Sequence, residues 1–275
     1  MTDENTPRTT RPRKWSLAGT VAATALAAAH PVVVTSLAAT TGLHASAAQA
    51  SEGGEAGESG EAGVELSEGP SAFLTQLGYF EGTYRIISRL YLDGETNAAR
   101  AHMEESHHAF YDDIEDALQA YGAPGFRAED AAFVAAVRDG ADADTVRKAF
   151  DTLHEAISLN AAAADASLRD QILSLKDLVA LAAAEYEGGV AGDGAIDIAI
   201  EYRDSWGFYD VARARARAMV DSGTPDAVKA GQDVLDQLDG AEALYPGLLT
   251  DKASTDPSQL TVATGWIEII ALRQD

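Results

Sequence analysis

The chain has 275 residues, no cysteine, and 44 acidic against 20 basic side chains, which gives a formal net charge of −24 at pH 7. Without cysteine it has no disulfide, no thiolate metal site and no cysteine nucleophile. A surface this acidic repels nucleic acid and anionic lipid and attracts cations, although the charge could also serve solubility alone.

The N-terminal region has the features of an export signal. Basic residues between Arg8 and Lys14 precede a small, apolar segment from Trp15 to Ala29, and after Pro31 the chain is apolar again from Val32 to Ala39. Ala48-Gln49-Ala50 fits a small-x-small cleavage site. We therefore expect a signal peptide over residues 1–50, cleavage after Ala50, and a periplasmic or secreted mature chain without a membrane span. An uncleaved membrane anchor is the alternative.

Residues 51–69 contain six Glu, six Gly and no basic residue. Such a segment cannot bury apolar surface, so it is predicted to be a disordered linker.

From Pro70 onward the apolar residues recur at helical spacing, and no segment alternates as a strand does. The pattern predicts an all-α fold with about eight helices in antiparallel hairpins. The expected helices run from Pro70 to Asp93-Gly94, over about 95–121, 128–138, 142–160, 168–186 and 195–220, from Thr224 to before Pro246, and from Asp256 to about 272. They form two bundles, 70–166 and 167–275, or one continuous stack.

Residues 102–116 combine three histidines with six carboxylates. On one continuous helix, residues three or four positions apart are neighbours, so Glu104, His108 and Asp112 would form a stripe and His102 would pair with Glu105. Imidazole and carboxylate ligands suit Fe, Zn, Cu or Mn. The predicted metal ligands are His102, Glu104, Glu105, His107, His108 and Asp112. The alternative makes His107 a core residue and the others surface groups.

Five further residues form a second tier of metal ligands. Glu81 could complete the site from the first helix, but an ion pair with Arg85 explains it equally well. The remaining four form two pairs in which a carboxylate is next to a tyrosine: Glu185, Tyr186, Glu201 and Tyr202. Such a pair can ligate ferric iron through its oxygen atoms. In the alternative, the tyrosines pack in the core and the glutamates face water. The chain has no nucleophile elbow and no P-loop, so no enzyme activity is predicted.

Two segments resemble exported helical proteins of bacterial iron uptake. Leu181 to Val190, then Gly192-Asp193-Gly194 and Glu201-Tyr202, resemble the periplasmic helical domain attached to some high-affinity iron permeases. His102-Met103-Glu104-Glu105 is similar to the His-x-x-Glu core of imelysin-like iron-uptake proteins, although Arg100 stands where those proteins carry glycine. The permeases' Arg-Glu-x-x-Glu membrane helices do not occur here.

The resemblance implies a periplasmic accessory protein that binds or hands over iron, with an envelope iron-transport protein as partner. The sequence therefore favours an exported, all-α, non-catalytic protein that binds a metal ion, with iron as the expected ion. The alternative is a helical interaction or structural module of the cell envelope that binds no metal.

Overall fold

The computed structural model describes residues 64, 66–106, 108 and 111–274. The predicted signal peptide (1–50), its cleavage site and most of the predicted linker lie outside these residues. Helices account for nearly all the regular structure, and extended pairing within the described ranges is limited to two isolated bridges, Val190 with Ile196 and Ala195 with Lys252. The prediction of an all-α fold is confirmed.

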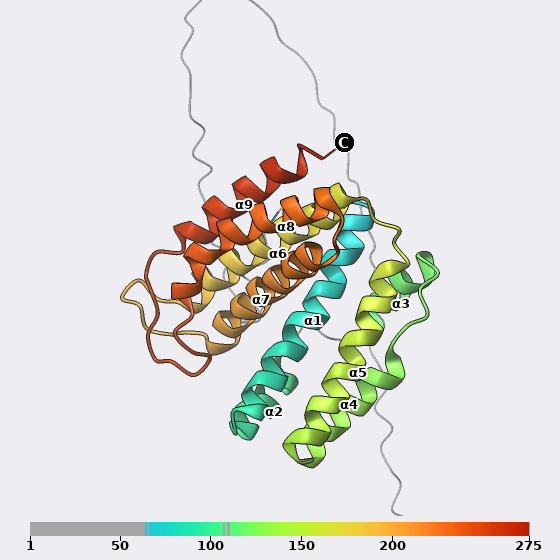
Figure 1. The fold of residues 1–275 in the computed structure, drawn as a ribbon. Helices are drawn as coiled ribbons and strands as arrows, with labels where there is room; N and C mark the ends of the chain where they lie inside the picture. Colours follow the sequence, from blue (N-terminus) through green and yellow to red (C-terminus); the bar gives the residue numbers. More distant parts are fainter. Residues whose placement is uncertain (1–63, 65, 107, 109–110, 275) are drawn as a thin grey trace, which may run out of the picture. The chain divides into compact units, whose positions relative to one another are not determined.

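The described part of the chain forms nine α-helices and one 3₁₀ helix (Figure 1). Their bounds are α1 Pro70–Leu92, α2 Thr96–Glu105, α3 Tyr111–Ala120, α4 Arg127–Asp139, α5 Ala143–Ala162, α6 Leu168–Gly189, α7 Ala199–Asp221, α8 Pro225–Leu238, η1 Asp239–Leu244 and α9 Ser258–Ala271.

Local sequence signals explain most of the helix ends. Pro70 and Pro225 each occupy the first turn of a helix, where a missing N–H costs nothing. The Ser167 hydroxyl and the Asp170 carboxylate form a capping box at the start of α6. Gly140 ends α4 in the left-handed conformation. These signals are why most of the predicted bounds agree with the structure to within a few residues.

The second half of the chain is a four-helix bundle in which α6 contacts α7 and α9, and α8 contacts the same two helices. Its core runs from Ile172 to Ala271 and includes Tyr186, Tyr202 and Phe208. A second apolar cluster, from Phe73 to Ala164, is built mainly on α1, α4 and α5.

Helix α1 connects these two cores, because it packs against α5 on one side and against α6 and α7 on the other (Figure 1). The predicted division of the chain at residue 166 falls between α5 and α6. Because α1 packs against both halves, the prediction of two bundles and the alternative of one continuous stack both describe this arrangement. Among the described helices, none combines the length and the apolar character that crossing a bilayer requires.

Candidate metal centre

The helix predicted over residues 95–121 is interrupted, and this part of the prediction is wrong. Helix α2 ends at Glu105, Ser106 has an extended backbone (φ −69°, ψ 134°), and α3 begins at Tyr111. The Ser106 hydroxyl accepts a hydrogen bond from the His108 backbone N–H at 3.4 Å and lies 3.4 Å from the Thr83 hydroxyl. Serine side chains can compete with helical hydrogen bonds in this way, so Glu104, His108 and Asp112 do not form one stripe.

The break directs two histidines toward the same acid on α7. His102 Nε2 lies 3.3 Å from Asp204 Oδ1, and His108 Nε2 lies 3.6 Å from Asp204 Oδ2. The His102 side chain is fully buried and that of Asp204 is 4% exposed. An acid and two imidazoles that are withdrawn from water together form a site that can take up a cation.

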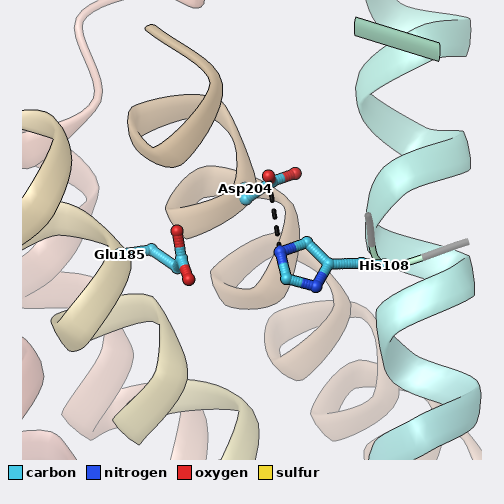
Figure 2. A group of neighbouring side chains, drawn as sticks. All are labelled: His108, Glu185 and Asp204. Atoms are coloured by element: carbon cyan, nitrogen blue, oxygen red, sulfur yellow. Dashed lines mark ion pairs between the residues drawn. The ribbon is translucent and has the colours of Figure 1, made fainter. Parts of the chain in front are cut away.

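Glu185 on α6 joins this group. One ligand atom from each of His108, Glu185 and Asp204 can be chosen so that all three lie within 4.8 Å of one another. Figure 2 shows the two carboxylates on neighbouring helices, with the His108 ring directed toward them from the other side. Ligand atoms bound to one transition metal lie about 2.0–2.2 Å from it, so three atoms this close to one another are candidate ligands of a shared ion.

Aromatic rings hold the His108 imidazole in place. Its ring centroid lies 5.4 Å from that of Phe208, in an edge-to-face arrangement, and 6.0 Å from that of Tyr79. Such contacts orient a ring that would otherwise rotate freely.

Glu201 lies one turn before Asp204 on α7 and is 2% exposed. Burial raises the pKa of the Glu201 carboxyl, and the nearby Asp204 charge raises it further. The Glu201 carboxylate lies against Gly188 of α6, where a Cβ atom would come within 1.9 Å of Oε2. Gly188 therefore provides the space that the Glu201 side chain occupies, three residues after Glu185 on the same helix.

The buried site, defined as His102, His108, Glu185, Glu201 and Asp204, concentrates unsatisfied polar atoms. Six buried side-chain N or O atoms in the described residues have no hydrogen-bond partner, and four of them are His102 Nδ1 and Nε2, Glu201 Oε2 and Asp204 Oδ1. His102 Nε2 is near Asp204, but not in hydrogen-bonding geometry. Buried polar groups are normally paired, so each exception calls for an explanation such as an ion.

The charge of the site also favours a cation. It contains three buried carboxylates, and the neighbouring guanidinium of Arg203 donates through Nε to the Leu248 carbonyl at 3.1 Å. Burial lowers the pKa of Arg203, while Glu105 and Asp204 act to raise it. A divalent or trivalent ion bound here would place further positive charge beside the three carboxylates.

The other predicted ligands on this segment do not reach the buried site. Glu104 and Glu105 are exposed at the end of α2. Asp112 is exposed and pairs with Arg127, with Oδ1 and Nη2 2.9 Å apart. His107 lies outside the described residues. The structure thus separates the His102 and Glu105 pair of the His-x-x-Glu motif, with the histidine inside and the acid in solvent.

The second-tier residues divide in the same way. Glu185 and Glu201 belong to the buried site, whereas Glu81 forms ion pairs with Arg85 and Arg215, as the ion-pair alternative predicts. The Tyr186 hydroxyl donates to the Ser254 carbonyl and the Tyr202 hydroxyl to that of Gly247. Burial raises the pKa of Tyr186 to about 12 and also raises that of Tyr202. Both tyrosines are therefore protonated core residues in this structure.

Asp204 is the residue that the sequence analysis missed. It lies on the same helical face as Glu201, and this i, i+3 pair of acids on a helix with an otherwise buried face was the available signal.

Residues 161–270 match the family model of the iron permease-associated 4-helix bundle domain. The matched range contains α6, α7 and α8 whole and all but the last residue of α9, and it confirms the predicted similarity to the helical domain of iron permeases. No curated protein and no solved structure matches the chain. The similarity to imelysin-like proteins stays a prediction.

The matched range supplies only part of the buried site. Glu185, Glu201 and Asp204 lie inside it, whereas His102 and His108 precede it in the chain. The similarity to the iron permease-associated domain therefore covers the carboxylates of the site, while the histidines belong to a segment that precedes the matched range.

Proposed function

We propose that this protein binds a transition-metal ion, with iron as the expected ion, through the buried site formed by His102, His108, Glu185, Glu201 and Asp204. The observation that carries the proposal is a buried group between α2, α6 and α7. Ligand atoms of His108, Glu185 and Asp204 lie within 4.8 Å of one another there, and polar atoms of His102, Glu201 and Asp204 have no hydrogen-bond partner among the described residues. Two imidazoles and three carboxylates form a ligand set that suits iron, manganese or zinc and is poorly matched to a soft metal.

The association with iron uptake rests on the matched range, because the family is described as iron permease-associated. The proposed role is to bind the metal outside the cytoplasm and pass it to an envelope iron-transport protein, without catalysis. Export rests on the predicted signal peptide, and the net charge of −24 is consistent with a protein whose partners are cations and proteins, not nucleic acid.

Metal titration tests the proposal. Anaerobic calorimetry with Fe²⁺, and parallel titrations with Mn²⁺, Zn²⁺ and Mg²⁺, should give one site that binds a transition metal far more tightly than the millimolar range of loose carboxylate sites. Asp204→Asn and His108→Ala should each weaken binding by about tenfold or more.

Two exposed acids provide matched controls. Glu104→Gln and Asp112→Asn remove carboxylates that the sequence pattern favours but that the structure places in solvent. Unchanged affinity in both is expected. A parent chain that binds no transition metal more tightly than about millimolar, or controls that weaken binding as much as Asp204→Asn does, would contradict the proposed site.

One feature favours the alternative function, an interaction module without metal. The outward face of α9 carries Val262, Trp266 and Ile269, and Leu272 follows at its C-terminal end; these four residues are between 39% and 58% exposed. An apolar stripe of this kind is typical of a protein contact surface. If the titrations show no metal site, Trp266→Ser should reduce association with envelope proteins in a cross-linking experiment, and unchanged cross-linking would speak against this function as well.

A further inference from the structure

A second site lies apart from the buried metal site and shares no residue with it. Helices α1, α5, α6 and α7 enclose a pocket of about 530 Å³, walled on its apolar side by Leu74, Ile157, Leu175 and Ala214. Pockets of about 300–1,000 Å³ with apolar walls and a few polar groups are the usual binding places for small organic molecules.

The polar end of this pocket is built on Glu81, whose side chain is 4% exposed. Arg85 Nη2 lies 2.8 Å from Glu81 Oε1, Arg215 Nη2 lies 3.1 Å from Oε2, and His154 Nδ1 lies 3.5 Å from Oε1. Burial alone would raise the pKa of Glu81, but Arg215, Arg85 and His154 together lower it. Glu81 is therefore ionised, and both of its oxygens are engaged by cationic groups.

The hydrogen-bonding capacity that remains here belongs to donors. A guanidinium carries five N–H groups. Arg85 donates three N–H groups, to Glu81 and Asp210. Arg215 donates two, to Glu81 and the Leu74 carbonyl, and its Nη2 also forms an ion pair with Glu81, so about two N–H groups remain on each guanidinium within the described structure. His154 Nδ1 is also buried without a hydrogen-bond partner among the described residues.

The acids near these arginines limit how strongly the net charge of the pocket can attract an anion. Asp210 pairs with Arg85 from its partly exposed position, and Asp165 is an exposed residue that also lines the pocket. Recognition would therefore depend on directed hydrogen bonds from the guanidinium groups, whose planar geometry matches the two oxygens of a carboxylate.

We propose that this pocket binds a small organic carboxylate, with its apolar body against Leu74, Ile157 and Leu175 and its carboxylate toward Arg85 and Arg215. The proposal is independent of metal binding, because no ligand of the buried site lines the pocket.

Three probes that share one apolar body test the proposal. 1-Naphthoate, 1-naphthalenemethanol and 1-naphthylmethylamine are titrated by calorimetry into the chelator-treated chain and into Asp204→Asn. We expect saturable binding of naphthoate, at least about tenfold tighter than that of the amine and tighter than that of the alcohol, and the same in both proteins.

Two variants locate the binding. Ala214→Phe fills the pocket, and Ser158→Trp covers it from an exposed position that leaves the core unchanged, while Ala135→Phe on the exposed face of α4 is the control. Both pocket variants should lose at least about tenfold in naphthoate affinity and the control none. Equal binding of the three probes, no saturable binding of naphthoate at millimolar concentration, or full affinity in both folded pocket variants would overturn the proposal.

Discussion

Replacing Glu201 by glutamine should stabilise the metal-free chain and weaken its metal binding at the same time. The Glu201 side chain is 2% exposed, its Oε2 atom has no hydrogen-bond partner in the part of the chain that the structure describes, and the Asp204 charge lies close by. Burial and like charge both disfavour the ionised carboxyl in the folded state. An amide of the same shape removes the charge, and with it the attraction for a cation.

The expected magnitudes follow from the burial of this group. An unsatisfied buried polar group costs about 1–3 kcal/mol. Because glutamine still buries polar atoms, we expect a gain near the lower limit, about 1 kcal/mol in the free energy of unfolding. For a domain of this size that gain corresponds to an increase of about 2–4 °C in Tm. Loss of one ligand or its orienting partner should reduce metal affinity by about tenfold or more.

Thermal unfolding followed by circular dichroism, with chelator and then with saturating Fe²⁺ or Mn²⁺, measures both effects. The variant should unfold at a higher temperature than the parent with chelator, and it should gain less from added metal. Glu187→Gln, which removes an exposed acid from α6, should change neither value. A variant that is destabilised without metal, or that keeps the parent's metal-induced shift, would refute the assignment of Glu201 to the site.

Three further substitutions test separate parts of the account. Because its cationic partners lower the pKa of Glu81 below its ordinary 4.5, the ion pairs stabilise the fold above that pH and the contribution is lost as the pH falls through the lowered value. Glu81→Gln should therefore lower the free energy of unfolding in urea by about 2–3 kcal/mol at pH 7 and by much less at pH 3. The loss at pH 7 is at or below the lower limit for a buried ion pair because the arginines are partly exposed. An equal loss at both pH values would be evidence against this reasoning. Gly188→Ala should displace the Glu201 carboxylate and weaken metal binding measured by calorimetry, whereas Gly192→Ala, with open space around it, should not; similar affinities would contradict the packing argument. Tyr186→Phe should leave metal affinity unchanged, since its hydroxyl bonds backbone carbonyls, and a large loss would restore the tyrosine as a ligand.

Helix positions could be predicted from the sequence because turn residues mark most of the ends. Pro70 and Pro225 fix the backbone at the start of a helix, and Gly140 readily adopts the left-handed conformation that ends one; these effects need no tertiary contact. The break at Ser106 could not be predicted in this way. The segment around it keeps helical spacing on both sides, and the contact of its hydroxyl with Thr83 exists only after α1 and α2 have packed together.

The same break explains which parts of the candidate site could be predicted. The sequence identified His102 and His108 by their chemistry, and Glu185 and Glu201 as carboxylates next to tyrosines. It assigned the histidines to partners on their own helix, because i, i+4 spacing is visible in a sequence and contacts between distant helices are not. Asp204, about a hundred residues from both histidines, becomes their neighbour only through the packing of α2 against the bundle.

The most direct test of the central claim is a crystal structure of the metal-loaded chain, with diffraction recorded at the absorption edge of the bound metal. The account predicts one strong anomalous peak about 2 Å from His108 Nε2 and from carboxylate oxygens of Glu185 and Asp204, between α6, α7 and the segment after α2. A peak on the exposed acids of α2 and α3, with the buried site unchanged, would contradict it.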